Sequence, residues 1–560
     1  MGPGKTPWTH KIKYDMHVPD KPNIDPNVLC AMVNDAQPGP NFVNKTVHIE
    51  SNLNLFAWEK YAYAFELDDP ALLDQLSWGF PTGVENPDKL SVPCTNHRTA
   101  RENPAIVEEY ILKHTKTKAV YGPFAHNPLS VPITVSPLQV AFSSSGKPRV
   151  CNDLSFGPCS VNSLISDKWD DYPGYFGDLE LPKIDGLVQA VLDRGPSCLL
   201  WKTDYSSYYK QLNTDPGHLP QLAFAYDGKV YFENRLPFGL RSSCLNAQRV
   251  TNAVIKIYDV TTKSSAFISG YIDDCIGCSY CDAAESDYSN FISLNHELGL
   301  DLTDPKCVSP CSCLVWIGLE CDVLCMKLRI PQDKLHRIVQ FLKGWLDKRR
   351  ASKTELQAIL GVLNHAAAAI IVGRAFTGHI MDLIRECDFP AELSTEFYKD
   401  IQFWLYFLQG ECSDGFSLKS PILIPVDHLV QVAFSADLFA VKILETTKIY
   451  QVADQDIDID HACLYTFAFW QATLVAAPRF PGTWITCGVL HESAVKTINR
   501  ARNVSVKLRP MVRHTWSIQA QHDMVIRAKK VICERPIDIV LRAAETGIPI
   551  SYKSVPDIVL

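Results

Sequence analysis

The chain has 560 residues, of which 46% are hydrophobic, so it can build several buried cores and we expect about three or four domains. Its formal net charge of −8 excludes an evenly basic nucleic-acid-binding surface, so any such surface has to be local. The most apolar run, residues 356–372, contains Gln357, Asn364 and His365, and we expect a buried helix there and not a membrane span.

The N-terminal part of the chain is expected to form an arm followed by helices. It lacks the apolar core of a signal peptide, so we expect an intracellular protein with no membrane partner. Residues 1–45 are rich in Pro, Asn and Asp and predict an extended arm, to which no function is assigned. Aromatic residues and Leu become frequent within residues 46–95, which predicts a small helical region. Asn103 at a cap and Pro104 in the first turn predict a helix that ends at about Lys116.

Two short β-elements and a turn are expected next. Residues 131–144 alternate like a hairpin strand, and residues 147–153 return after a Ser-Gly turn. The apolar residues 199–203 predict a buried strand that ends at Asp204 and leads into a turn rich in aromatic residues.

A further turn precedes a predicted helix. Pro237 and Gly239 allow the backbone to approach a flat ligand. Ser242 or Ser243 is expected to cap a helix that runs on from Leu245.

Two adjacent carboxylates, Asp273 and Asp274, lie within residues 267–278. The apolar residues on either side predict two short strands, so the acids occupy the tip of a hairpin. Adjacent like charges at a turn are costly, and a cation such as Mg²⁺ would stabilise them. The alternative interpretation is a solvated Asp-Asp turn.

A metal site follows if the strand that ends at Asp204 lies beside this hairpin. Three carboxylates can hold two Mg²⁺ ions about 3.5–4 Å apart, with Mn²⁺ as an alternative metal. Such a pair activates a 3′-hydroxyl and stabilises a leaving pyrophosphate, which is most of what phosphoryl transfer requires of a protein. The predicted metal ligands are therefore Asp204, Asp273 and Asp274.

The chain has 19 cysteines, and without a secretion signal we expect reduced thiols. Either a zinc site or small buried side chains would explain a local concentration of them. Cys275 and Cys278 point to opposite faces of the strand that leaves the hairpin, which favours buried side chains. The concentration comprises Cys275, Cys278, Cys281, Cys307, Cys311, Cys313, Cys321 and Cys325.

Helices are expected after residue 330. Apolar residues at helical spacing over 331–346 predict one helix, and Ser352-Lys-Thr-Glu355 is a capping box that opens a second. Others are expected near Asp382 and over residues 394–404. Basic residues gather here, either as a solvated helical face or as phosphate contacts of helices that grip a duplex. They are Lys327, Arg329, Lys334, Arg337, Lys343, Lys348, Arg349, Arg350 and Lys353.

The acidic elements and the turn between them resemble, in order, the palm of a reverse transcriptase. The strand that ends at Asp204 resembles the first palm motif, Leu236-Pro-Phe-Gly239 the nucleotide-binding turn, and Tyr271-Ile-Asp-Asp274 the tetrapeptide of the family. The resemblance covers roughly residues 96–383.

Two further motifs extend this resemblance. Residues 298–306 resemble the motif whose lysine, here Lys306, is a possible acid that protonates pyrophosphate. Residues 316–320 resemble the primer-grip hairpin. The expected nucleic-acid contacts are Trp316, Gly318, Lys348, Arg349 and Arg350.

The resemblance also implies which residues bind the incoming nucleotide. Arg149 is expected on the triphosphate, where a bidentate guanidinium suits phosphate oxygens. Relatives carry a Lys where this chain has Phe142 or Ser143, so either Lys147 substitutes for it or triphosphate binding is weakened. The other expected substrate contacts are Tyr205, Tyr209, Phe238 and Gly239.

Two tyrosines after the first palm motif have alternative interpretations. By resemblance, the ring of Tyr209 would lie under the sugar and exclude a ribose 2′-hydroxyl, which predicts deoxynucleotide substrates. Tyr208 is larger than the small residue that relatives often have, which would make the pocket tighter. The alternative for both rings is a place in the palm core.

Within the reverse transcriptases, the chain most resembles the DIRS type of retrotransposon. No recombinase, integrase or protease motif is visible, so this resemblance implies that integration depends on a separate tyrosine recombinase. The similar blocks are Asn96-His97 with Ala100, Gly122-Pro-Phe124, Ser136-Pro-Leu138, Arg149 with Asn152-Asp-Leu-Ser155, and Gly361-Val-Leu-Asn364 with Gly373-Arg-Ala-Phe376.

Residues 426–560 resemble a ribonuclease H domain with an incomplete set of acids. In that family, catalysis needs four carboxylates around two metal ions. Asp437 is one residue out of phase, which turns a strand side chain to the other face. Leu490 stands where an Asp is expected, although Glu492 is near, and Asp538 alone matches.

The first helix of this domain also lacks its expected Glu, since Cys463 or Tyr465 occupies that position. We therefore expect a ribonuclease H-like domain whose own activity is impaired or absent and which carries the RNA/DNA hybrid.

The expected fold is α+β, a right-hand polymerase followed by a ribonuclease H-like α/β domain. Fingers and palm are expected over residues 96–325, the thumb over 326–410, a linker over 411–425, and the ribonuclease H-like domain over 426–560.

The expected function is that of an RNA-directed DNA polymerase of a retroelement, which extends a DNA or RNA primer with dNTPs on an RNA template. Asp204 and Asp273 would bridge the metal ions and Asp274 would support them. The alternatives are a non-catalytic nucleic-acid-binding scaffold with the same fold, and a structural assembly protein.

Overall fold

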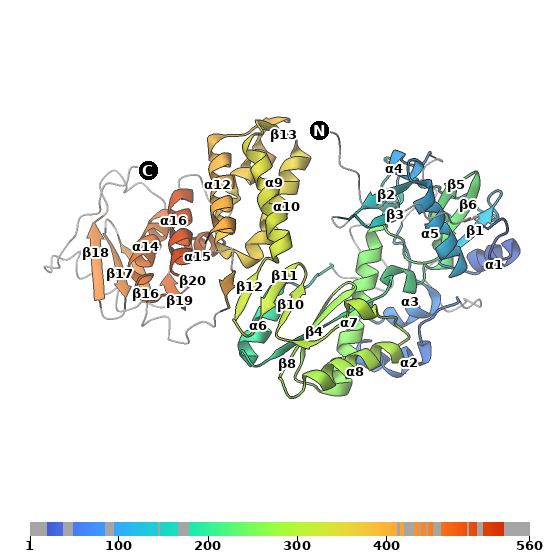
Figure 1. Ribbon diagram of the computed structural model, residues 1–560, viewed down its shortest axis with the longest axis horizontal. Coiled ribbons are helices and arrows are strands. Elements are labelled where there is room, and N and C mark those ends of the chain that lie inside the picture. The colour runs from blue at the N-terminus through green and yellow to red at the C-terminus, as the bar shows by residue number, and fades with distance from the viewer. Residues whose placement is uncertain are drawn as a thin grey trace. The chain divides into compact units, whose positions relative to one another are not determined.

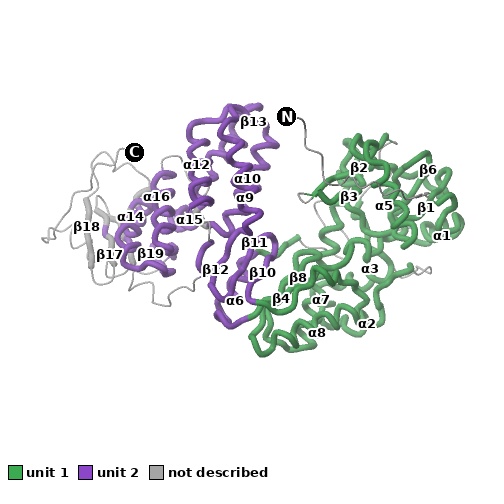
Figure 2. Tube along the Cα trace, in the orientation of Figure 1, with its two compact units in different colours: residues 1–183, 199–311 green, residues 184–198, 312–560 purple. Residues whose placement is uncertain are grey.

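The computed structural model contains two compact units, each with helices and strands (Figures 1 and 2). Unit 1 comprises residues 1–183 and 199–311, and unit 2 comprises residues 184–198 and 312–560. The predicted mixture of helices and strands is confirmed. The structure describes residues 19–36, 49–84, 94–143, 146–165, 179–410, 415–418, 430–435, 438–443, 446–451, 461–489, 492–500 and 508–530.

Unit 1 contains an antiparallel sheet of four strands, in the order β7-β8-β4-β9. The predicted neighbourhood of the strand that ends at Asp204 and the acidic hairpin is confirmed, because β4 pairs with β8 along its whole length. The strands are β4 (Leu199–Asp204), β7 (Phe267–Tyr271), β8 (Asp274–Ser279) and β9 (Val308–Cys311).

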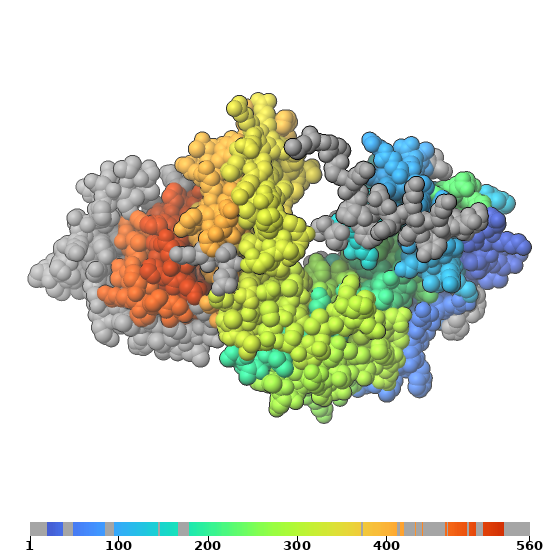
Figure 3. Space-filling view, in the orientation of Figure 1, coloured from blue at the N-terminus to red at the C-terminus, as the bar shows by residue number. Residues whose placement is uncertain are grey.

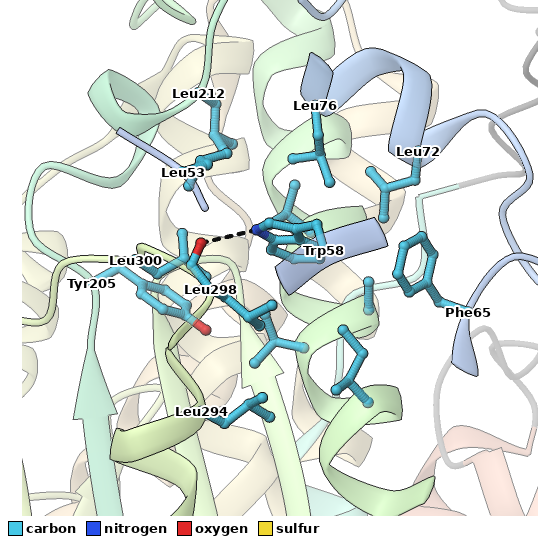
Figure 4. Close-up of a cluster of buried hydrophobic side chains, with 14 of the residues drawn as sticks. Leu53, Trp58, Phe65, Leu72, Leu76, Tyr205, Leu212, Leu294, Leu298 and Leu300 are labelled. Carbon is cyan, nitrogen blue, oxygen red and sulfur yellow. Dashed lines mark hydrogen bonds between the residues drawn. The ribbon is translucent and has the colours of Figure 1, made fainter. Parts of the chain in front are cut away.

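A large apolar core joins this sheet to helices from three parts of the chain. The long helix α7 (Arg241–Thr262) and α8 (Ala284–Glu297) contribute to it, as do the shorter α2 (Leu55–Lys60) and α3 (Leu72–Trp78). The buried indole N–H of Trp58 donates to the carbonyl oxygen of Leu298 at 3.0 Å (Figure 4). The N-terminal helical region is therefore part of the same core as the sheet.

The rest of unit 1 contains smaller β-elements. The sheet β1-β6-β5 has three strands, and β2 and β3 form the predicted hairpin, although its first strand begins at Leu138 and not at residue 131. The predicted helix after Asn103 is confirmed as α5. The elements are α4 (Arg98–Arg101), α5 (Pro104–Lys116), β1 (Val120–Phe124), β2 (Leu138–Phe142), β3 (Pro148–Asn152), β5 (Ala223–Tyr226) and β6 (Lys229–Glu233).

The prediction of an extended arm over residues 1–45 is wrong for residues 26–36, which form α1 (Pro26–Ala36). Pro26 occupies the first turn, where its missing N–H costs nothing, and the Asp25 side chain accepts a hydrogen bond from the N–H of Asn27. The buried residues Leu29, Met32, Val33 and Ala36 follow at helical spacing. The high content of Pro, Asn and Asp in the flanking sequence obscured this short apolar face.

The start of α7 also differs from the prediction. The helix begins at Arg241, and Leu240 at the cap makes no side-chain hydrogen bond. Ser242 and Ser243 lie inside the first turn, where their hydroxyls donate to the carbonyl oxygens of Thr82 (2.8 Å) and Pro237 (2.9 Å). Ser243 therefore ties the helix to the turn before it, Ser242 ties it to the distant Thr82, and neither serine caps the helix.

The first part of unit 2 has a small sheet, β10-β11-β12-β15, the helix α6 (Ile184–Arg194) and several helices after residue 330. The predicted capping box at Ser352 and Glu355 is confirmed at the start of α10. The side chains of α9 and α10, in yellow, are open to view in Figure 3, and Phe341 and Leu346 of α9 are exposed. The elements are β10 (Cys313–Trp316), β11 (Leu319–Asp322), β12 (Lys327–Arg329), β15 (Phe416–Ser417), α9 (Gln332–Leu346), α10 (Lys353–Ala369), α11 (Gly378–Glu386) and α12 (Thr395–Gln409).

The second part of unit 2 contains a sheet in the order β18-β17-β16-β19-β20. The first three strands along the chain pair antiparallel, β19 pairs parallel with β16, and β20 pairs parallel with β19. The elements are β16 (Val430–Ser435), β17 (Leu438–Ile443), β18 (Thr446–Gln451), α14 (His461–Ala476), β19 (Trp484–Val489), α15 (Glu492–Arg500), α16 (Arg509–Gln521) and β20 (Val525–Lys530).

The predicted burial of the clustered cysteines is only partly confirmed. Cys275 and Cys278 on β8 are fully buried, and so is Cys321 on β11. Cys281, Cys313 and Cys325 are exposed, which corrects the prediction for them.

Candidate active site

Asp204 and Asp274 lie opposite each other on neighbouring strands. The antiparallel register of β4 and β8 pairs these two residues, and that of β7 and β8 pairs Tyr271 with Asp274. Asp273 lies at the tip of the hairpin, where its carbonyl oxygen accepts a hydrogen bond of 2.9 Å from the N–H of Tyr205. The structure therefore brings the three predicted acids to one end of the sheet in unit 1.

The hairpin tip has a strained backbone that α7 holds in place. Ile272 has φ +55, a conformation that a β-branched side chain rarely adopts. Gln248 accepts a hydrogen bond from the N–H of Ile272 and donates one to the carbonyl oxygen of Gly270, both at 2.8 Å. The hydroxyl of Thr251 donates to the carbonyl oxygen of Ile272 at 2.6 Å. These bonds fix the direction in which Asp273 and Asp274 leave the turn.

Burial and mutual repulsion alter the acidity of the two hairpin acids. The pKa of Asp273 is raised, first by burial and then by the nearby charge of Asp204, while Lys306 and Arg149 lower it. Burial likewise raises the pKa of Asp274 to about 6, against the lowering effect of Lys202. Because Arg149 and Lys306 lower the pKa of Asp273, positive side chains from two other parts of the chain lie close enough to stabilise its charge.

Lysines are hydrogen-bonded to two of the three acids. Lys306 Nζ, on a side chain that is 55% exposed, lies 2.7 Å from Asp204 Oδ1. Lys202 Nζ lies 2.8 Å from Asp274 Oδ2. Both ion pairs use one carboxylate oxygen, so they reduce the number of oxygens that face a cation.

The fit of these acids to a metal ion is therefore uneven. Within the described part of the chain, no three His, Cys, Asp or Glu side chains are grouped as ligands of one ion. Asp204 and Asp273 nevertheless act on each other as neighbouring like charges, and a divalent cation would stabilise such a pair. Asp204 Oδ1 and Asp274 Oδ2 each contact a lysine, so a metal ion at either acid would have to displace that lysine or use the other carboxylate oxygen.

Three predicted nucleotide contacts lie close together. The guanidinium of Arg149 is 5.8 Å from the centre of the Phe238 ring, which in turn is 5.0 Å from the Tyr209 ring. Arg149 and Phe238 are exposed and Tyr209 is half-buried. A planar base or a triphosphate could reach all three side chains in unit 1.

Gly239 allows the turn before α7 to approach β3. Its φ is +104, and a Cβ atom at this position would lie 2.1 Å from the carbonyl oxygen of Asn152. A larger residue would therefore push the turn and β3 apart, and Phe238 would move away from Arg149.

Lys147 lies at the start of the returning strand and is exposed. Its N–H donates to Ser143 Oγ at 3.0 Å. Phe142, one of the two positions at which the resemblance implies a lysine, is also exposed.

Tyr205 and Tyr208 belong to the core. The rings stack at 4.4 Å, and Tyr205 OH donates to the buried Asn295 Oδ1 at 2.8 Å. The prediction that the Tyr205 side chain contacts substrate is therefore wrong, because period-2 alternation turns it away from Asp204. The core interpretation of Tyr208 is confirmed, since its hydroxyl donates to the carbonyl oxygen of Ala247.

The predicted primer grip is a tight turn between β10 and β11 in unit 2. Trp316 is 1% exposed, so the prediction that its ring contacts nucleic acid is wrong. Gly318 has φ +78 and lies at the turn, where Lys334 Nζ contacts its carbonyl oxygen at 3.3 Å. His365 lies 3.0 Å from the carbonyl oxygen of Ile317. The turn is thus held from α9 and α10.

Two of the three basic residues predicted to contact nucleic acid, Lys348 and Arg350, are paired with acids. Lys348 forms an ion pair with Glu355, and Arg350 forms one with Glu392 at 2.7 Å. Arg349 is exposed. The side chains that face solvent therefore carry less net positive charge than the sequence indicates.

Of the three predicted ribonuclease H acids, Asp437 and Asp538 lie outside the described residues. Glu492 is at the start of α15 and is exposed, with ion pairs to Lys496 (2.9 Å) and Lys530 (3.0 Å). These hydrogen bonds lower its pKa to about 2.

Sequence reasoning missed four residues of the site, namely Lys202, Cys244, Gln248 and Thr251. Lys202 and Asp204 are two residues apart on a strand, so they share a face. The other three recur at intervals of four and three residues, which places them on one face of α7. Both periodicities were visible in the sequence, but what each face meets depends on contacts with distant segments.

Sequence comparisons identify no family for the chain. No family model matches it, and neither does any curated protein. Its function therefore has to be inferred from its own residues.

In the described part of the chain, no helix is both long and apolar enough to cross a membrane.

Similar solved structures are complexes of the foamy viral protease-reverse transcriptase. One, of the dRH form with double-stranded DNA, has 14% identity and a TM-score of 0.47, over 89% of this chain and 84% of that chain. A second, with double-stranded DNA, has 13% identity and a TM-score of 0.47, over 87% of this chain and 99% of that chain. A third, with an RNA/DNA hybrid, has 13% identity and a TM-score of 0.45, over 94% of this chain and 67% of that chain.

Proposed function

We propose that the chain is an RNA-directed DNA polymerase that extends a DNA or RNA primer with dNTPs on an RNA template. The observation that carries this proposal is the pairing of Asp204 with Asp274 across two strands, with Asp273 beside them at a strained tip. Three acids gathered at a backbone that is costly to maintain indicate a functional site.

Asp204 and Asp273 would hold Mg²⁺, or Mn²⁺ in its place, and Asp274 would support them through its ion pair with Lys202. When bound, the metal supplies activation of the primer 3′-hydroxyl and neutralisation of charge on the leaving pyrophosphate. Arg149 binds the triphosphate oxygens through paired hydrogen bonds. Lys306, whose amine is already beside Asp204, gives a proton to the leaving pyrophosphate.

Phe238 and Tyr209, whose rings are neighbours, line the nucleotide, and Gly239 lets the turn approach it. Lys147 reaches the triphosphate from the turn of the β2–β3 hairpin.

Nucleic-acid partners would be the template–primer duplex and the RNA/DNA hybrid product. In unit 2 the exposed Arg349 and the turn at Gly318 would contact phosphates.

We further propose that the last sheet belongs to a ribonuclease H-like domain without activity of its own. The strand order β18-β17-β16-β19-β20, antiparallel and then parallel, supports the resemblance noted in the sequence. The two lysines on Glu492 support the loss of activity, because a carboxylate paired twice is a poor metal ligand.

The DIRS-type resemblance, with a separate tyrosine recombinase as partner, is also a proposal. Three of its short blocks, at residues 96–100, 136–138 and 149–155, are linked in unit 1, whereas the blocks at residues 361–364 and 373–376 lie in unit 2. The Asn96 side chain accepts a hydrogen bond from the N–H of Leu138 at 2.8 Å, and His97 pairs with Asp153 at 2.7 Å. Blocks far apart in the sequence thus build one local structure.

A non-catalytic nucleic-acid-binding scaffold is the second candidate function. The ion pairs of Lys306 with Asp204 and of Lys202 with Asp274 favour it, because they neutralise two of the acids without a metal. It predicts binding of a template–primer duplex that does not depend on Mg²⁺ or dNTP.

Primer extension separates the two candidates. A labelled primer on an RNA template, with Mg²⁺ and dNTPs, should be lengthened by the wild-type protein. Binding of the same duplex without any extension, under the same conditions and in Mn²⁺, would favour the scaffold.

A further inference from the structure

The hydroxyl group of Tyr209 has a specific partner in α7. Its oxygen lies 3.0 Å from Cys244 Sγ, in the first turn of that helix. The pKa of Tyr209 is raised, first by burial and then by this hydrogen bond, so the phenol is neutral at physiological pH. The ring is therefore anchored at its far end as well as at its Cα.

Phe238 supports the same ring from another side. The two rings are 5.0 Å apart at 60°, and the Phe238 ring is partly exposed. This ring–ring contact is apolar and has no directional hydrogen bond. It limits how far the Tyr209 ring can move, but it does not fix the orientation of the ring. The hydrogen bond to Cys244 is directional, so it selects one orientation of the Tyr209 ring.

The same face of α7 also positions the acids. Cys244, Gln248 and Thr251 lie on one side of the helix, and Gln248 and Thr251 hold the hairpin tip at Ile272. One rigid helix therefore fixes the Tyr209 hydroxyl relative to Asp273. Replacing Cys244 by Ala would remove the anchor and leave a small space into which the ring could tilt.

We infer that Cys244 is a positioning residue for sugar selection: it holds the Tyr209 ring where a ribose 2′-hydroxyl would collide with it. This inference rests on the proposed polymerase function. Cys244 touches no substrate atom and acts through Tyr209, so its loss lowers the selectivity for dNTPs over rNTPs. Chemistry at Asp204 and Asp273 does not require the thiol.

Single-nucleotide primer extension with one dNTP and the matching rNTP tests this inference. The quantity measured is the ratio of kcat/KM for the dNTP to kcat/KM for the rNTP. We expect Cys244→Ala to lower this ratio about tenfold, as expected when one contact of a selective site is lost. Cys244→Ser keeps a polar group at the same place and should restore most of the ratio.

A double-variant comparison shows whether the effect passes through the hydroxyl. Tyr209→Phe keeps the ring and removes the hydroxyl, so it should lower the ratio as much as Cys244→Ala does. The double variant should show no further loss, because both changes remove the same bond. Cys30→Ala, at a half-buried cysteine of α1, is the matched control and should leave the ratio unchanged.

The possible failures are distinguishable. An unchanged ratio in Cys244→Ala, with normal dNTP incorporation, would overturn the role of Cys244 and leave the polymerase proposal intact. Additive losses in the double variant would also overturn it. Absence of dNTP incorporation by the wild-type protein would overturn the polymerase function and this inference together. If Cys244→Ala unfolds at a lower temperature, the Ser variant and Tyr209→Phe still decide the question.

Discussion

Lys202 Nζ lies 2.8 Å from Asp274 Oδ2, and Lys202 precedes Asp204 by two residues on β4. Side chains two residues apart on a strand share a face, so the lysine reaches across to the neighbouring strand on the side where the acids lie. Lys202 is therefore an internal counter-ion of the acidic hairpin.

Removal of this counter-ion should change the pH dependence of primer extension. The pKa of Asp274 is about 6 although Lys202 lowers it, so Lys202→Met should raise that pKa further. If Asp274 acts as a carboxylate, wild-type activity falls as the pH drops through about 6, and in the variant the fall begins at higher pH.

Initial rates measured over roughly pH 5 to 8.5 check this prediction. Lys256→Met is the control, because Lys256 pairs with the exposed Asp68 at 3.2 Å and not with a hairpin acid. An unshifted acidic limb in Lys202→Met would show that Asp274 does not govern activity.

Gln248→Leu should impair the hairpin without removing any acid. The change leaves the N–H of Ile272 and the carbonyl oxygen of Gly270 without their partner, at a cost of about 1–3 kcal/mol in the free energy of unfolding. Because the tip is strained, we also expect kcat to fall about 10- to 100-fold through misplacement of Asp273.

Chemical denaturation and steady-state kinetics measure the two effects of Gln248→Leu. Gln189→Leu is a matched control, since Gln189 is exposed and bonds only to Asp193 among the contacts described. Wild-type kcat in Gln248→Leu would show that α7 does not position the acids.

Much of the site was predictable because local patterns determine it. The strand that ends at Asp204 and the hairpin around Asp273 have apolar runs that specify short buried strands, and the structure confirms both. One assumption was needed to join them into a site, namely that the strand ending at Asp204 lies beside the hairpin.

The errors come from contacts between distant segments. Trp316 was expected to meet nucleic acid, but its ring is buried, which the sequence around it does not indicate. Ser242 and Ser243 have the composition of caps, yet their hydroxyls bond to distant or preceding carbonyl groups. The resemblance implied a substrate contact for Tyr205, but Tyr205 directly follows Asp204, and neighbouring side chains on a strand point to opposite faces.

Trp58 should contribute strongly to the stability of unit 1. Its indole is fully buried and donates to the carbonyl oxygen of Leu298 (Figure 4). We expect Trp58→Ala to lower the free energy of unfolding by about 3–5 kcal/mol. Phe56→Ala, on the same helix but 79% exposed, should change it by less than about 0.5 kcal/mol.

Equilibrium denaturation of both α2 variants checks this prediction. Equal, small effects would show that the N-terminal helices are not part of the sheet core.

The last domain should not cleave RNA. Glu492 is already paired with Lys496 and Lys530, so Glu492→Gln should leave any hybrid degradation unchanged. The measurement uses an RNA/DNA hybrid with labelled RNA in Mg²⁺, and the wild-type protein should release no fragments. Degradation that is lost in Asp538→Asn would show an active ribonuclease H.

Primer extension by acid variants tests the polymerase proposal most directly. The experiment compares wild type, Asp204→Asn, and the combined Asp273→Asn and Asp274→Asn variant on an RNA template with dNTPs and Mg²⁺. We expect wild-type extension, and a loss of at least about 10³-fold in both variants because a metal-binding acid is gone. Duplex binding should persist in both variants. Extension that survives the combined change at Asp273 and Asp274 would contradict the assignment of the active site.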